Sequence, residues 1–467
     1  MFETIPYISL GIILALSLCL GFLGKRAGSD DNFFIGSRKA HWFPLSFSIA
    51  AGYFYAGVPF FILKWTNIEG FYGGIWVTLG IIAPLLILGV VGYYLSKYKN
   101  FGKFFNMNDF VYDKTQSKKL TYIFIFVYFL ASIYAMTVNL TALGFVAEYF
   151  TTVNYAWFTG LFLVGIILYT AIGGFPAVIR TDILQLVLML IGGLGVGLLI
   201  ANNVSSPTEV IQTSIANNGK GLFDTEFLTN IFLVVLIIIT GSAFADNQLW
   251  QRMFTINNGK RLLKSYLMAA VIYFVACFGV ILVYSTALAG GSLGKNAIFG
   301  VIDAIKANGG TVLVMLFVMA ILAGSASTLD SVMHSVSSIL SKQFSKLKKQ
   351  RVIANAIVVG FSLIIYIITQ FKIDIWVLLT TFGTVRLCIV IPTLYLIFFN
   401  NPRVLATALS ILIALAFGLF LQSTELSKLY TVLITIVTPL PILLTVVNLE
   451  KIYYNNRKGV SNGSKKL

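Results

Sequence analysis

A run of small hydroxyl residues around one carboxylate is the strongest chemical signal in this sequence. Its members recur at spacings of three and four, which place them on one face of a helix: Gly324, Ser327, Thr328 and Ser331. Sodium is a hard cation that prefers oxygen ligands, and such a face would supply about half of its shell. Close helix packing with self-bonded hydroxyls is the competing interpretation. Asp330 favours the ion site, because packing does not require a carboxylate there.

A second polar cluster follows a Gly-Gly-Phe-Pro break at 173–176. Arg180 and Asp182 stand just inside the next apolar stretch. A tight cytoplasmic turn closed by an ion pair explains this pattern as well as a cation-relay role for Asp182 does.

Two apolar stretches carry interruptions typical of broken membrane helices. The stretch 44–64 contains a small-residue run at 50–52 and the aromatic residues Tyr53, Phe54 and Tyr55. The stretch 227–247 weakens at Gly241-Ser242 and ends in Asp246-Asn247. Broken helices expose carbonyl groups that can hold ions or substrate, so two breaks about 190 residues apart predict a central binding site. Glycine also occurs in ordinary membrane helices.

Arg386 is a lone cation deep in an apolar stretch. Its guanidinium could bind a substrate carboxylate, pair with a protein acid, or snorkel to an interface. The sequence alone leaves all three open.

The composition requires these residues to sit in a membrane. Of the 467 residues, 58% are hydrophobic and 11% charged, whereas soluble domains carry about 25% charged residues. The net charge of +16 does not indicate nucleic acid, because Lys and Arg fall almost wholly in short loops. The three cysteines, Cys19, Cys277 and Cys388, lie in apolar stretches without disulfide or metal-ligand spacing.

Thirteen stretches are long and apolar enough to cross a bilayer. They are 6–24, 44–64, 72–96, 120–148, 154–173, 176–200, 227–247, 267–289, 311–338, 352–370, 375–397, 404–421 and 429–449. With the N-terminus outside and the C-terminus inside, 25 of the 33 basic residues fall in inside loops. This asymmetry predicts a multi-pass protein of the inner (plasma) membrane. The tail 451–467 is basic and cytoplasmic in this arrangement.

The motifs taken together resemble the sodium/solute symporter family. Four local patterns occur in the family's order: Asp31-Asn32-Phe33-Phe34-Ile35-Gly36-Ser37-Arg38; Gly173-Gly174 through Thr181-Asp182 and Gln185; Asp246-Asn247 followed by Gln251-Arg252; and Ser327-Thr328-Leu329-Asp330-Ser331. The resemblance covers about residues 5–450.

This resemblance implies a LeuT-type fold with two inverted repeats of five helices, at 44–200 and 227–397. An N-terminal helix and first cytoplasmic loop (1–43) precede them, the external loop 201–226 joins them, and two further helices (398–450) follow. The implied sodium site lies between the first and eighth core helices. Its ligands are the Ser327 and Thr328 hydroxyls and the carbonyls of Gly324, Ala51 and Phe54, the last two to within one residue.

Some relatives of this kind have a second sodium site, which maps to Asp182, Ser327, Asp330 and Ser331. The departures from the family pattern concern the substrate. Aromatic residues follow the first break, and Arg386 stands where a Phe-Gly-Pro pattern is usual. Tyr53, Tyr55, Asn247 and Arg386 are the expected substrate-cavity residues.

The predicted function is therefore sodium-coupled symport of a small organic solute by alternating access, with a carboxylate-bearing solute faintly favoured by Arg386. Sodium is the coupling ion, no organic cofactor is expected, and the partners are the solute, sodium and the lipid bilayer. A proton-coupled carrier using Asp182, Asp330 or His334, and a non-transporting nutrient sensor, are the alternatives. No nucleophile–base pair or metal cluster indicates an enzyme.

Overall fold

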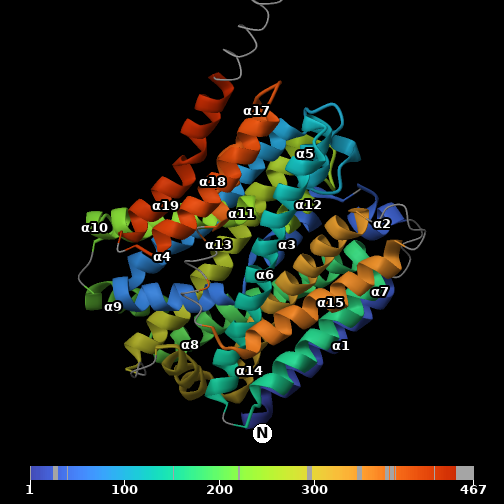
Figure 1. Cartoon of the computed structure of the whole chain (residues 1–467). Coiled ribbons are helices and arrows are strands. Elements are labelled where there is room, and N and C mark those ends of the chain that lie inside the picture. Colours follow the sequence, from blue (N-terminus) through green and yellow to red (C-terminus); the bar gives the residue numbers. More distant parts are fainter. Residues whose placement is uncertain are drawn as a thin grey trace, which may run out of the picture.

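The computed structural model is an all-helical bundle (Figure 1). It describes residues 2–24, 30–38, 40–150, 152–218, 221–291, 297–343, 350–373, 378, 383, 385–424 and 426–448. The helices are α1 (Ile5–Gly24), α2 (Asp30–Ile35), α3 (Trp42–Tyr53), α4 (Gly57–Leu95), α5 (Met107–Thr115), α6 (Lys118–Tyr149), α7 (Tyr155–Leu190), α8 (Val196–Val204), α9 (Pro207–Asn218), α10 (Thr225–Phe227), α11 (Leu233–Phe244), α12 (Asn247–Met253), α13 (Gly259–Ala289), α14 (Ala297–Gln343), α15 (Gln350–Gln370), α17 (Val390–Phe398), α18 (Val404–Gln422) and α19 (Lys428–Val437).

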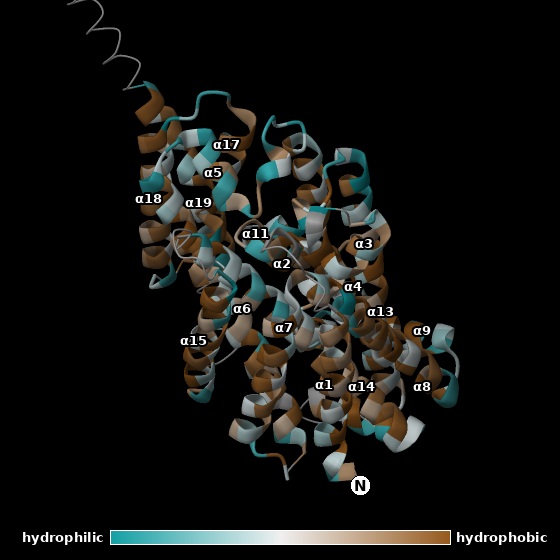
Figure 2. Ribbon diagram, turned by 90° about the vertical axis from the view of Figure 1, so that its right-hand side faces the viewer, coloured by the Kyte–Doolittle hydropathy of each residue, from teal (hydrophilic) through white to brown (hydrophobic). Residues whose placement is uncertain are grey.

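Nine helices in the described part of the chain are long and apolar enough to cross a membrane. A tenth is added if α11 and α12, bent by 63° at their junction, form one broken span. Large apolar side chains on the outer faces are exposed, among them Val164 on α7 and Phe420 on α18. Figure 2 shows apolar residues along the lengths of such helices, as expected of surfaces that contact lipid. The chain is a multi-pass membrane protein.

Single glycines interrupt three of the longest helices. Gly70 in α4, Gly174 in α7 and Gly310 in α14 have φ of 76°, 58° and 71°, a region that residues with a Cβ rarely enter. Gly70 lies in the connection 65–71 between two predicted spans, and Gly174 lies in the predicted Gly-Gly-Phe-Pro break. The predicted spans 267–289 and 311–338 leave 290–310 between them as an external loop, but its residues from Ala297 onward are helical and run into α14.

The innermost helices come from distant parts of the sequence. α13 packs along both α3 and α4, while α14 packs against α6 and α7. α1 lies beside α7 and α14, whereas on the opposite side α18 packs against α19 and α19 packs against α11 (Figure 1). α13 and α14 therefore contact both halves of the first broken helix, α3–α4, and α12 of the second broken helix packs against α3 and α14. Most of the predicted span 375–397, and the tail 451–467, lie outside the described residues.

The connection between α4 and α6 is a short folded segment. α5 begins with a capping box, in which Asn106 and Asp109 each accept backbone N–H groups. Burial, assisted by a hydrogen bond to Asp113, raises the pKa of Tyr98 to about 12. Lys342, at the end of α14, contacts Asp109 at 2.5 Å and so ties this segment to the helix that carries the hydroxyl run.

Candidate functional site

The first helix break exposes backbone groups in the middle of the bundle. α3 ends at Tyr53, where the N–H of Phe54 donates to Ala51 O, and α4 begins at Gly57. The free N–H of Ala56 donates to Asn139 Oδ1 of α6 at 2.7 Å. This side-chain contact satisfies the first N–H group after the break. The carbonyls of Gly52 and Phe54 at the break face Thr328 of α14.

One hydroxyl on α14 meets these carbonyls. Thr328 Oγ1 lies 3.3 Å from Gly52 O, 3.4 Å from Phe54 O and 3.2 Å from Gly324 O. A hydroxyl has a single proton to donate, so three acceptors exceed what Thr328 can serve. The surplus of oxygen lone pairs around one buried point is the arrangement that a hard cation requires. Gly52, one residue beyond the expected Ala51, supplies the carbonyl that faces Thr328.

Ser327 points to a different partner. Its hydroxyl donates to Asp182 Oδ1 of α7 at 2.5 Å. Neighbouring residues on a helix are separated by about 100° of rotation, so the two adjacent hydroxyls face different sides. The structure thus brings Thr328, Gly324 and Phe54 together and joins Ser327 to Asp182.

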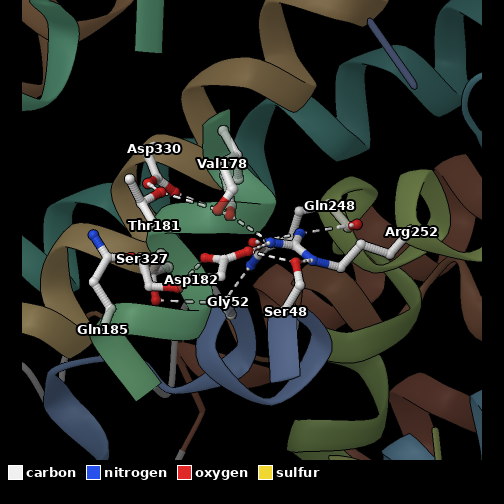
Figure 3. A network of polar contacts seen from close by, with 12 residues as sticks. Ser48, Gly52, Val178, Thr181, Asp182, Gln185, Gln248, Arg252, Ser327 and Asp330 are labelled. Carbon is white, nitrogen blue, oxygen red and sulfur yellow. Dashed lines mark hydrogen bonds and ion pairs between the residues drawn. The ribbon is translucent and has the colours of Figure 1, made fainter. Parts of the chain in front are cut away.

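A buried ion pair stands beside this contact (Figure 3). Arg252 Nη2 lies 2.8 Å from Asp182 Oδ2 and 2.6 Å from Ser331 Oγ, and Nε donates to Ser48 Oγ at 2.9 Å. Ser48 also donates to Asp182. The Arg252 and Asp182 side chains are 1% and 0% exposed. Charges buried to this degree persist only when paired and hydrogen-bonded, as these are.

Asp330 occupies a neighbouring pocket of hydroxyl groups. Its Oδ2 accepts from Tyr169 Oη at 2.7 Å and from Thr181 Oγ1 at 3.3 Å, and its Oδ1 accepts from Ser331 Oγ at 3.1 Å. Ser331 therefore bridges Asp330 to Arg252. The expected trio of Asp182, Asp330 and Ser331 is brought together around one guanidinium.

The second helix break presents a carboxylate at a helix start. Asp246 caps α12 by accepting the N–H of Gln248, and its Oδ2 also accepts from Gln248 Nε2 at 2.8 Å. Tyr55, which follows the first break, donates to the same Oδ2 at 2.9 Å. Gln248 Nε2 in turn donates to Gly52 O at 2.8 Å. The two breaks are thus linked directly by hydrogen bonds.

The remaining expected substrate residues lie at different depths. Asn247 Nδ2 donates to Ser335 O of α14 at 3.4 Å, and Tyr53 donates to Ile81 O of α4. Arg386 is 2% exposed, and its Cζ lies 3.9 Å from the centre of the Tyr134 ring on α6. An interfacial, snorkelling position for Arg386 is thereby excluded. Its contact with Tyr134 is a cation–π interaction.

Several residues that the sequence did not single out help to build the site: Ser48, Asn139, Tyr169 and Gln248. Arg252 was noted only as part of a family pattern and not as a site residue. Arg252 was expected in an inside loop, since it follows the apolar stretch that ends at 247. The helix α12 instead carries it into the bundle. Within the described residues, no group of three or more His, Cys, Asp or Glu side chains could hold a metal ion.

Two broken helices whose breaks are joined by hydrogen bonds, within a bundle of long apolar helices, are typical of LeuT-type transporters. The chain belongs to the sodium:solute symporter family, whose model matches residues 33–399. The expected family and the expectation that the chain is not an enzyme are confirmed by this match.

Two curated proteins are similar over part of the chain. The sodium/pantothenate symporter of Haemophilus influenzae is 27% identical over 258 residues, which are 50% of this chain and 52% of that protein. The sodium/pantothenate symporter of Escherichia coli is 27% identical over 254 residues, 49% of this chain and 50% of that protein. The match thus spans about half the length of these relatives.

Solved structures share the fold. A Na⁺-coupled sialic acid symporter in a substrate-bound outward-open state has a TM-score of 0.81 at 17% identity, over 95% of this chain and 97% of that one. A nucleobase-cation-symport-1 family transporter, in a closed conformation with bromovinylhydantoin bound, has a TM-score of 0.56 at 13% identity, over 89% of this chain and 94% of that one. A manganese transporter of Eremococcus coleocola has a TM-score of 0.55 at 14% identity, over 90% of this chain and 95% of that one. The LeuT-type fold expected from the motifs is confirmed.

Proposed function

We propose that this protein is a sodium-coupled symporter that carries a small organic solute into the cell by alternating access. The observation that carries the proposal is the convergence of three carbonyl oxygens, from Gly52, Phe54 and Gly324, on the single hydroxyl of Thr328. Sodium bound there would tie the broken helix α3–α4 to α14. An ion can bias a conformational equilibrium only through differential affinity for the two states, and a site shared by two helices provides that difference.

One sodium ion supplies enough free energy for accumulation. A potential of about 150 mV contributes roughly 3.5 kcal/mol per charge moved. A tenfold sodium gradient adds about 1.4 kcal/mol. Together, at about 4.9 kcal/mol, they would sustain a roughly three-thousandfold gradient of a neutral solute.

The solute site of this proposal lies between the two breaks, at Tyr53, Tyr55, Asn247 and Arg386. Tyr55 bonds Asp246 across the breaks, and Arg386 places a buried cation beside Tyr134. A guanidinium at that depth suits a carboxylate-bearing solute. If so, Arg386→Gln would weaken binding of that solute more than binding of sodium.

The number of membrane crossings proposed is thirteen. Four crossings beyond the nine long helices are supported by the kink of α4 at Gly70, the kink of α7 at Gly174, the bent pair α11–α12, and the shorter apolar helix Val385–Phe398. As single straight helices, α4 and Tyr155–Val204 would be about 58 and 75 Å long. The hydrocarbon core of a bilayer is only roughly 30 Å thick, so each is long enough for two crossings. The N-terminus would lie outside and the C-terminus inside the inner membrane, with repeats at 44–200 and 227–397.

Proton coupling is the second candidate. It is favoured by the surroundings of Asp330, whose hydrogen-bond donors in the described structure are the hydroxyls of Tyr169, Thr181 and Ser331. A carboxyl group surrounded by hydroxyls can hold a proton without losing a bonded partner. Replacing sodium by choline at fixed pH separates this alternative from sodium coupling.

A thermal-shift screen of the purified protein tests the function. Small solutes are added in sodium and then in potassium, and the Ser327→Ala/Thr328→Ala double variant is compared with Ser337→Ala. Ser337 is a matched control, since its hydroxyl bonds only His334 O of its own helix in the described structure. The proposal expects a solute that stabilises in sodium alone, with the sodium effect lost only in the double variant. Sodium-dependent stabilisation that survives in the double variant would remove the proposed site.

A further inference from the structure

The outer side of α4 changes from apolar to basic at the end of the helix. Ile87 and Val90 are exposed apolar residues. Tyr94 and Lys97, both exposed, continue the same side of the helix, since the four positions lie three or four residues apart. A Tyr followed by a Lys at the end of such an apolar face is typical of the boundary between lipid and water.

The start of α13 repeats this arrangement beside it. Val271 and Leu267 are exposed apolar residues, and Lys264 continues their side of the helix toward its first turn. α13 packs along α4. A Cβ on Gly259, the first residue of α13, would lie 3.2 Å from Cδ2 of Tyr93 near the end of α4. The two basic helix ends are therefore neighbours.

Aromatic rings hold both cations. Lys264 Nζ lies 3.8 Å from the centre of the Trp42 ring, at the start of α3. Lys97 Nζ lies 4.5 Å and 5.0 Å from the centres of the Tyr93 and Tyr94 rings. A ring attracts a cation through its quadrupole but carries no net charge, so both positive charges remain to be balanced.

The chain supplies no acid to balance them. The three segments that meet at this corner, 32–68, 70–108 and 247–302, contain no Asp or Glu. Within the described residues, neither Lys97 nor Lys264 forms an ion pair, whereas Lys342 contacts Asp109. An anion that also has an apolar part would fit both the two cations and the exposed apolar faces below them. An anionic phospholipid is such a molecule.

We propose that the corner formed by α3, α4 and α13 binds an anionic phospholipid. The headgroup phosphate lies between Lys97 and Lys264, and the acyl chains lie along the exposed faces of α4 and α13. Membrane topology by itself favours basic residues in such loops, but it does not require two lysines on aromatic rings at the ends of two adjacent apolar faces. This inference is independent of the solute and of the coupling ion.

Thermal unfolding of the purified full-length protein in a neutral detergent tests the proposal. Dioleoyl-phosphatidylglycerol, dioleoyl-phosphatidylcholine and inorganic phosphate are titrated separately. Phosphatidylglycerol is expected to raise the melting temperature in a saturable way, and the other two are not. Lys97→Gln/Lys264→Gln should weaken the apparent affinity for phosphatidylglycerol roughly thirtyfold. Lys118→Gln/Lys119→Gln is the matched control, since it removes two exposed lysines at the start of α6, and its affinity should equal that of the wild type.

Three results overturn the proposal. Equal stabilisation by phosphatidylcholine would show that the headgroup charge is not recognised, and equal stabilisation by inorganic phosphate would show a site for a free anion. Equal weakening in the two double variants would show that only the total charge of the protein matters. The comparison of the three additives uses the wild type alone, so the proposal stays testable even if Lys97→Gln/Lys264→Gln does not fold.

Discussion

Gly52 and Arg252 lie so close that a single methyl group on the glycine would collide with the guanidinium. The ideal Cβ would stand 2.7 Å from Nη2 and also 3.0 Å from Gln248 Oε1. Both atoms it would meet are buried and hydrogen-bonded, Nη2 to Asp182 and Ser331 and Oε1 at 3.4 Å from Arg252 Nη1. The close approach of α3 to α12 therefore depends on the absence of a side chain at one position.

Gly52→Ala is expected to destabilise the protein through this collision. Overpacking of a filled interior lowers the free energy of unfolding by about 1–3 kcal/mol. Displacement of Arg252 would in addition weaken its contact with Asp182. Thermal unfolding in detergent measures the effect. Gly360→Ala on α15 is the control, because its Cβ would meet nothing within 4 Å. Equal melting temperatures for the two variants would contradict the prediction.

Gly174→Ala is expected to be more damaging than Gly310→Ala. Both glycines have positive φ, 58° and 71°, so both substitutions carry backbone strain. At Gly174 the new Cβ would also lie 2.8 Å from Phe33 O, a backbone atom, whereas at Gly310 nothing lies within 4 Å. The difference between the two melting temperatures isolates the collision with α2. Similar losses for both variants would show that strain alone governs these kinks.

The kink at Gly174 is a feature of the fold that could be predicted from the sequence. Gly-Gly-Phe-Pro marked the kink of α7 because glycine and proline act locally on the backbone. Ser327 and Thr328 were expected on one face of a helix, but they face Asp182 of α7 and Gly52 of α3, because adjacent helical residues are rotated by about 100°. Arg252 was different. A cation just beyond an apolar stretch fits an inside loop equally well, and its partner Asp182 stands 70 residues away in the sequence. Only the packing of α12 against α3 and α14, which brings Arg252 to Asp182, decides between the two positions.

Asn139→Ala is expected to weaken sodium binding without touching the proposed ligands. The Asn139 side chain accepts the N–H of Ala56 at 2.7 Å, directly after the break. Removing this side chain takes away the acceptor of the buried Ala56 N–H, which lowers the stability of the local structure by about 1–3 kcal/mol. The Phe54 carbonyl two residues earlier would then be held less firmly. A sodium titration followed by thermal shift measures the apparent affinity.

Asn308→Ala provides the comparison for that variant. Its side-chain amide donates to Ala304 O of the same helix, away from the breaks. Its sodium affinity should equal that of the wild type. If Asn139→Ala binds sodium with wild-type affinity, the geometry of the first helix break does not affect sodium binding. That result would count against Gly52 and Phe54 as sodium ligands.

The proposed crossing number predicts on which side of the membrane two exposed positions lie. Lys103 precedes α6, and Glu209 lies in α9. If α7 is cut at Gly174 into two crossings, three crossings separate these positions and they face opposite sides. If Tyr155–Val204 is one crossing, two separate them and they face the same side. Single cysteines are introduced at Lys103 and Glu209 after replacement of Cys19, Cys277 and Cys388. A membrane-impermeant maleimide should label Glu209→Cys in intact cells and Lys103→Cys only after permeabilisation. Labelling of both from outside, or of neither, would contradict the cut at Gly174, and the reverse pattern would invert the proposed orientation.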